Sequence, residues 1–164
     1  MNPSRILPDL QSSLICEEVR QEINGNFILV GVLGFVRVPQ VPITAHKLCV
    51  FNRWTSGLGQ FTEVVRLVAP DQTTVLRTGQ TRFGLQDAAH HATNLTLLGQ
   101  VQFPAAGVYY IEVLVDEVMK IRYPFPVVLV PPPKKQGSPT TRTESPQPES
   151  PPPTPRPPTP DAEP

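Results

Sequence analysis

The sequence predicts an all-β fold, an antiparallel β-sandwich followed by a disordered, proline-rich tail. The first observation is a series of short segments in which apolar and polar residues alternate, with turn residues between them. The second is the lack of any long segment with the apolar period of a helix. The third is a change of composition near Val130, after which 14 of the 22 prolines occur.

The strand at the centre of this prediction is 109–116, YYIEVLVD. Successive side chains of a strand point to opposite faces. One face therefore carries Tyr109, Ile111, Val113 and Val115. The other carries Tyr110, Glu112, Leu114 and Asp116. Gly107 precedes Tyr109 by two residues, a spacing typical of immunoglobulin-like sandwiches, in which the tyrosine ring closes one end of the core. The predicted sandwich is therefore immunoglobulin-like.

The other strands are predicted from the same alternation and from the turns between them. They are 14–23, 27–33, 35–38, 45–54, 61–69, 73–78, 93–103, 118–123 and 125–130. Asn24-Gly25 predicts a two-residue hairpin turn, because both residues tolerate positive φ. Pro70-Asp71 predicts a β-turn, because proline fixes φ at the value the turn needs.

Three features modify these strands. Gly31 interrupts an apolar run, which predicts a bulge or the close approach of another backbone. Pro124 and Pro126 lack the N–H that a strand ladder needs, so the last strand is expected at a sheet edge. The segment 84–92 is the longest irregular stretch before the tail, with room for one helical turn.

The chain divides into a loose lead-in at 1–12, a sandwich domain at 13–130 and a disordered tail at 131–164. After Val130 the sequence contains no Val, Ile, Leu, Met, Phe, Trp, Tyr or Cys. Such a segment cannot bury enough apolar surface to offset the entropy lost on ordering.

Charge and composition exclude several classes of partner. The formal net charge is zero, and no basic cluster that would favour nucleic acid is visible. No apolar run is long enough to span a membrane, and the N-terminus lacks the apolar core of a signal peptide. We therefore expect a cytoplasmic protein without a cofactor. Cys16 and Cys49 lie in apolar runs and are expected as buried thiols; the alternative, a disulfide, needs oxidising surroundings and close Cβ atoms.

Two parts of the sequence resemble a family of small uncharacterised bacterial proteins, a domain of unknown function. The first is ICEEVRQE at 15–22 with Gly25 and LVGV at 29–32; the second is Gly107-x-Tyr109 with VLVD at 113–116. The resemblance covers about residues 12 to 130. It implies a bacterial, cytosolic sandwich and supplies no activity and no catalytic residues. The sequence departs from the family pattern at Glu117, where a glycine is expected in the last hairpin.

The best candidate metal ligands are Asp87, His90 and His91, since imidazole and carboxylate bind metals and all three lie in the 84–92 segment. His46 or Cys49 would have to complete the site. Adjacent histidines in an extended chain point in opposite directions, so a solvated loop is the competing interpretation. No serine carries a catalytic motif around it, and we expect no enzyme activity.

Four residues are candidates for binding a partner. Glu18 and Arg20 belong to a charged patch beside the Asn24-Gly25 turn, where they either protect an edge strand or select a partner. Trp54 is either an exposed recognition aromatic or a core residue. Arg156 lies within the proline-rich run 151–160, which has the spacing of a polyproline II ligand; the alternative is a solubilising spacer.

The sequence thus favours a non-enzymatic, cytosolic protein-interaction or adaptor module whose partner is a protein. The alternatives are a small-molecule or metal-binding module that uses the 84–92 loop, and a structural subunit of a larger assembly. The sequence does not set the oligomeric state.

Overall fold

The structure is a computed structural model that describes residues 5–132. Nine strands occur in this part of the chain and no helix, so no helix there could cross a membrane. In chain order the strands are β1 (Asp9–Gln21), β2 (Phe27–Val32), β3 (Val36–Val38), β4 (Ile43–Thr55), β5 (Gly59–Val68), β6 (Val75–Leu85), β7 (His91–Phe103), β8 (Gly107–Val115) and β9 (Val118–Leu129). The predicted all-β class is confirmed. The predicted tail lies outside the described residues, apart from Pro131 and Pro132.

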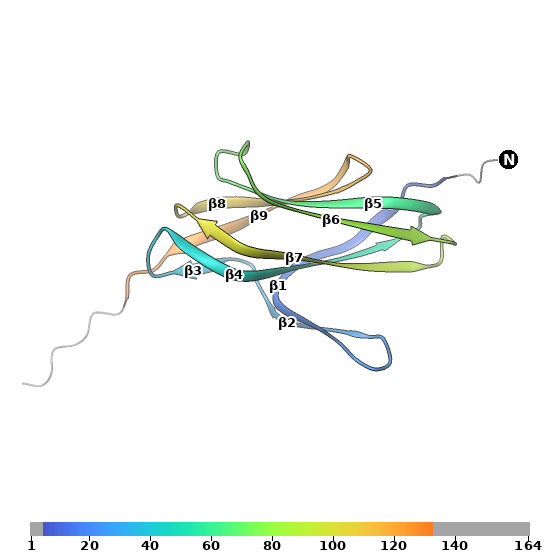
Figure 1. Cartoon of the computed structure of the whole chain (residues 1–164), viewed down its shortest axis with the longest axis horizontal. Coiled ribbons are helices and arrows are strands. Elements are labelled where there is room, and N and C mark those ends of the chain that lie inside the picture. Colours follow the sequence, from blue (N-terminus) through green and yellow to red (C-terminus); the bar gives the residue numbers. More distant parts are fainter. Residues whose placement is uncertain (1–4, 133–164) are drawn as a thin grey trace, which may run out of the picture. The chain divides into compact units, whose positions relative to one another are not determined.

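The strands form two sheets, one with the order β2-β1-β4-β7 and one with the order β3-β9-β8-β5-β6 (Figure 1). All pairs are antiparallel except β3 and β9, which are parallel. The five-stranded sheet is therefore mixed, and the prediction of a wholly antiparallel sandwich is wrong at this edge. The cause is a crossing: Val36–Val38 does not extend β2 within its sheet but pairs with Val127–Leu129 in the other sheet.

The main core lies between the sheets, and β4 shows how the sequence builds it. Leu48, Val50 and Trp54 belong to this core, as the predicted alternation requires. Cys49 and Phe51 point to the opposite face and form a second, smaller cluster with Cys16. β4 lies between β1 and β7, so both of its edges are paired, and the two clusters bury apolar side chains on both of its faces.

Tyr109 closes one end of the main core, as predicted. Its side chain is fully buried, and its ring meets the Phe103 ring edge-on at a centroid distance of 5.0 Å. The phenol donates a hydrogen bond of 2.7 Å to the carbonyl oxygen of Ala105. Burial raises the pKa of this phenol, although the hydrogen bond opposes the shift. The buried hydroxyl therefore has the partner that it needs.

The predicted hairpin between β1 and β2 is confirmed, but its predicted two-residue turn is wrong. Five residues, 22–26, join the strands, and in this loop only Gly25 has positive φ, at 88°. Gly31 also has positive φ, at 64°, and a Cβ there would lie 2.8 Å from the Glu17 side chain. Gly31 therefore lies against a side chain, and not against the other backbone that was predicted to approach it.

Several element bounds differ from the prediction. β1 begins at Asp9, inside the predicted lead-in, and Ile6 pairs with Leu58 ahead of it. β9 runs unbroken through both prolines. Its end, Val127–Leu129, pairs with β3, whereas 118–126, which includes both prolines, pairs with β8 alone. The predicted 84–92 loop shrinks to 86–90, without a helical turn, because β6 extends to Leu85.

Cys16 and Cys49 are cross-strand partners in β1 and β4, and both are buried and free. Burial raises the pKa of the Cys16 thiol, and the neighbouring Cys49 adds to the shift. The expectation of two buried thiols is confirmed.

Candidate functional site

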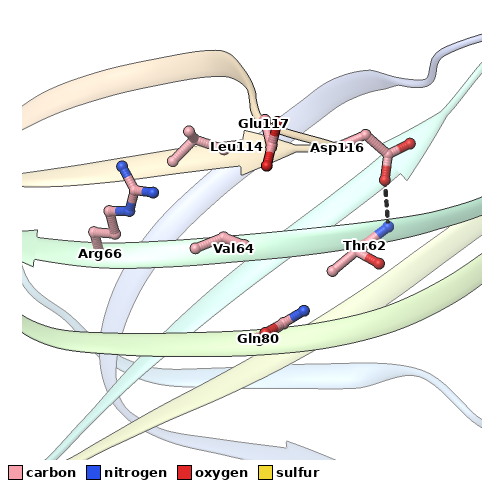
Figure 2. A pocket seen from close by; sticks show the side chains of 7 residues that line it. All are labelled: Thr62, Val64, Arg66, Gln80, Leu114, Asp116 and Glu117. Atoms are coloured by element: carbon pink, nitrogen blue, oxygen red, sulfur yellow. Dashed lines mark hydrogen bonds between the residues drawn. The ribbon is translucent and has the colours of Figure 1, made fainter.

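A hollow of about 510 Å³ lies on the outer face of the five-stranded sheet. Its walls come from β5, β6, β8 and the turn that follows β8. The lining residues are Thr62, Val64, Arg66, Gln80, Leu114, Asp116 and Glu117 (Figure 2). This volume falls within the range of sites that bind ligands in proteins.

The hollow has an apolar floor and charged ends. Val64 and Leu114 are cross-strand partners in β5 and β8 and form the floor. Figure 2 shows Arg66 at one end and Asp116 at the other, with Glu117 between Leu114 and Asp116. Arg66 lies four residues beyond Thr62 on β5, which corresponds to about 13 Å along a strand. Because the Thr62 N–H bonds to Asp116, this is also the approximate separation of Arg66 from the Asp116 carboxylate, and an extended peptide of about five residues would span it.

The end of the hollow at Arg66 carries more positive than negative charge. Arg66 and Arg122 both pair with one carboxylate, that of Glu112, at N···O distances of 3.9 and 3.7 Å. The Glu112 side chain is only 10 % exposed, whereas that of Arg66 is 41 % exposed. The Arg122 guanidinium also lies over the Tyr110 ring, 4.4 Å from its centroid. One carboxylate cannot neutralise two guanidinium groups, so Arg66 can accept a further anion.

The two carboxylates at the other end differ in role. Asp116 accepts a 2.9 Å hydrogen bond from the backbone N–H of Thr62 and forms an ion pair with Arg5. Its own N–H donates to the carbonyl oxygen of Thr62 at 2.9 Å. Asp116 thus fixes the turn to β5. Glu117 is exposed and forms no salt bridge with any residue in 5–132.

The backbone that presents Glu117 is strained. Asp116 and Glu117 are the two turn residues between β8 and β9, with φ values of 45° and 69°. Positive φ at both positions is the pattern of a type I′ turn, which favours asparagine or aspartate followed by glycine. A glutamate in this conformation costs free energy, and such costs are concentrated at functional sites.

We expect Glu117→Gly to stabilise the protein by about 0.5–1 kcal/mol, because glycine adopts positive φ without the steric cost of a Cβ. Urea denaturation of the variant and the wild type measures the difference. Glu117→Ala is the control, because it removes the carboxylate and keeps the strain. A Glu117→Gly variant no more stable than Glu117→Ala would show that this turn carries no strain.

A second polar cluster lies inside the core and has no access to solvent. Glu63 on β5 is fully buried and accepts hydrogen bonds from the Trp54 indole and, at 3.1 Å, from the Asn94 amide. Burial raises the pKa of this carboxyl group, although its hydrogen bonds oppose the shift. Within residues 5–132, the other Glu63 oxygen, the Asn52 amide and the Thr96 hydroxyl form no hydrogen bond of regular geometry. The cluster around Glu63 therefore affects the stability of the fold, and its buried side chains cannot contact a partner protein.

A family model, "Family of unknown function (DUF6941)", matches residues 11–128 of the chain. The chain belongs to this family. The match includes every residue that lines the hollow, and it confirms the predicted resemblance to a family without an assigned activity. No curated protein matches the chain.

The predicted partner-binding residues of this DUF6941 chain do not lie in the hollow. Glu18 and Arg20 pair with each other at 3.0 Å, and the hydrogen bond from Arg20 lowers the pKa of Glu18. β1, which carries them, is not an edge strand, because β2 lies outside it. Trp54 is fully buried, so its core role holds and the idea of an exposed recognition aromatic is wrong. Arg156 lies outside the described residues.

The predicted metal ligands of this DUF6941 chain do not form a site together. Asp87 accepts a 2.7 Å hydrogen bond from the backbone N–H of Ala89, and His90 and His91 are exposed. Within residues 5–132, no group of three or more His, Cys, Asp or Glu side chains is placed to hold a metal ion. His91 instead lines a separate groove of about 440 Å³ beside Phe27 and Phe51.

Sequence reasoning missed Arg66, Glu117 and the other lining residues as a site. The signal for two of them was present, because alternation along 109–116 places Leu114 and Asp116 on the face opposite the core. The same alternation applies to Thr62, Val64 and Arg66 in β5. What the sequence does not contain is the register that sets Val64 opposite Leu114.

Proposed function

We propose that the protein is a non-enzymatic protein-interaction module whose hollow holds an extended segment of a partner protein. The observation that carries the proposal is the opposite charge at the two ends of the apolar floor formed by Val64 and Leu114. The partner segment places an acidic side chain near Arg66, a basic one near Glu117 and small apolar residues between them.

The chemistry of the lining supports a peptide segment. Complementary charges fix the orientation of a bound segment and exclude like-charged competitors. The Thr62 hydroxyl and the Gln80 amide lie on the lining as well, and both can donate and accept hydrogen bonds to a peptide backbone. The strained turn at Glu117 supports the same function, because the chain keeps a carboxylate where glycine would be more stable.

We also propose that the topology is immunoglobulin-like. In the five-stranded sheet, the order β9-β8-β5-β6 corresponds to the G-F-C-C′ order of variable-type domains. In the other sheet, β1-β4-β7 corresponds to A-B-E. The Tyr109 hydroxyl, bonded to a carbonyl four residues upstream, corresponds to the tyrosine corner at the start of strand F. In this correspondence the hollow lies on the G-F-C-C′ face.

The test is to capture binding proteins from a lysate of the source cells on the immobilised protein and to quantify them by mass spectrometry. Wild type, Arg66→Glu and Glu117→Lys are compared with Arg53→Glu, which makes the same kind of change at an exposed residue of β4 on the other sheet. We expect a shared set of captured proteins that both hollow variants lose and that Arg53→Glu retains. The same captured set with all four proteins would contradict the proposal.

A further inference from the structure

Cys16 and Cys49 form a pair of thiols across two neighbouring strands. They are directly opposite each other in the register of β1 and β4, on the face that points away from the main core. Cys16 Sγ lies 3.7 Å from the carbonyl oxygen of Cys49, and Cys49 Sγ lies 3.6 Å from the carbonyl oxygen of Glu17. Each thiol therefore contacts the backbone of the other's strand, and both sulfur atoms lie close to the space between the two strands.

This arrangement meets the geometric condition for a disulfide bond. Side chains directly opposite on antiparallel strands have Cβ atoms about 4.5–5.5 Å apart. A disulfide needs a Cβ separation of about 3.5–4.5 Å, so a movement of about 1 Å between the strands closes the bond. Disulfides closed under such strain are easily reduced, which is typical of reversible disulfides and not of permanent structural ones.

We propose that Cys16 and Cys49 are a redox-sensitive pair, which a small-molecule disulfide converts reversibly to a cross-strand disulfide. One cysteine thiolate attacks a sulfur atom of the small disulfide, which forms a mixed disulfide and releases one small thiol. The second cysteine then attacks the protein sulfur of the mixed disulfide and releases the other small thiol. The two cysteines together lose two electrons and two protons, and the small disulfide is reduced to two thiols.

The β1–β2 hairpin controls access to this pair. Both cysteines are buried, and burial raises the pKa of the Cys16 thiol, so the covered pair reacts slowly. Val19 of β1 and Phe27 and Leu29 of β2 pack against the cluster that contains the cysteines. Among the strands of the described chain, β2 pairs with β1 alone, so few backbone hydrogen bonds hold it in place. Local opening of this hairpin exposes the thiols while the main core stays folded.

Phe27→Ala should speed the oxidation of the pair about tenfold, because the Phe27 ring no longer packs on Phe51, which it meets at a centroid distance of 5.7 Å. Mass spectrometry of samples quenched with acid follows the reaction. Phe35→Ala is the matched control, since Phe35 is 45 % exposed and lies outside the cluster around the cysteines. It should react like wild type. Equal rates for the two variants would overturn the role of the hairpin.

Equilibration of the full chain with oxidised and reduced glutathione tests the pair itself. We expect the equilibrium constant for disulfide formation to be about tenfold or more higher in the folded protein than in the chain unfolded in urea, because the fold holds the two thiols together. The equilibrium is approached from both the dithiol and the disulfide form, and intact mass reports the loss of two hydrogen atoms. Dithiothreitol should restore the dithiol form completely.

Cys16→Ala and Cys49→Ala are the controls for this equilibrium. Each keeps one thiol, so each can form a mixed disulfide with glutathione but not the intramolecular bond. Wild type should instead lose two hydrogen atoms without gaining a glutathione. A folded wild type that stays in the dithiol form at a glutathione ratio that oxidises the unfolded chain would overturn the proposal. Wild type that gains glutathione as the single-cysteine variants do would overturn it as well.

Discussion

Tyr109→Ala should lower the free energy of unfolding by about 3–5 kcal/mol, the usual cost of removing a large buried aromatic side chain. The ring is fully buried against Phe103, so its removal leaves a cavity in a close-packed core. A single domain has roughly 5–15 kcal/mol of stability, so this one substitution removes a large share. Urea denaturation followed by tryptophan fluorescence measures it, because the single Trp54 is in the same core.

Tyr109→Phe is the control, because it keeps the ring and removes only the hydrogen bond to Ala105. We expect that change to cost about 1 kcal/mol, a typical value for one hydrogen bond. Equal losses from both variants would show that the hydroxyl, and not the packing of the ring, holds this end of the core. A negligible loss from Tyr109→Ala would contradict the account of the core.

Glu63→Gln should remove a pH dependence that wild type shows. Burial raises the pKa of Glu63 above its ordinary value of 4.5, so the carboxyl group holds its proton more strongly in the folded protein than in the unfolded chain. Its contribution to stability is therefore complete below the unfolded-state pKa and is lost as the pH rises through the raised folded-state pKa. Wild type should be more stable at about pH 5 than at about pH 8, whereas Glu63→Gln should have nearly equal stability at both.

Glutamine also fits the hydrogen bonds of the site. Its amide oxygen can accept from Trp54 and Asn94, as the carboxylate does, and its amide N–H groups can donate to the unpaired oxygens of Asn52 and Thr96. At the higher pH, we expect the free energy of unfolding of Glu63→Gln to exceed that of wild type by about 1–3 kcal/mol, which is the usual cost of a buried polar group without its partners. Asp71, whose pKa is lowered to about 2 by hydrogen bonds from Thr74 and Thr73, does not titrate in this window. A Glu63→Gln variant with the same pH profile as wild type would exclude Glu63 as the origin of that dependence.

The alternation of apolar and polar residues correctly predicted which side chains of a strand point into the core, wherever one or both faces of the strand are buried. It separated Leu48, Val50 and Trp54 from Cys49 and Phe51, and the structure has the same division. It also placed Tyr109 toward the core. These residues are determined by local periodicity and burial, both of which can be read from the sequence.

Features that depend on pairing between distant strands were not predictable. Nothing in Val36–Val38 indicates that this segment leaves the sheet of β2 and pairs in parallel with β9. Glu63 interrupts an apolar face, but its partners Trp54 and Asn94 come from two strands of the other sheet. The hollow combines Arg66 with Glu117 in the same way. The parallel pair, the Glu63 cluster and the hollow all depend on which strands pair and in which register, and local sequence does not determine this pairing.

The most direct test of the proposed function is an NMR titration of the ¹⁵N-labelled protein with a designed peptide. Acetyl-Asp-Ala-Val-Ala-Lys-amide spans about 13 Å between its charged residues when extended, which matches the ends of the hollow. We predict saturable shifts of the Val64 and Leu114 amides, weakened by Arg66→Glu and absent with acetyl-Asn-Ala-Val-Ala-Gln-amide. Equal shifts from both peptides, or shifts confined to residues outside the hollow, would contradict the assignment of this site.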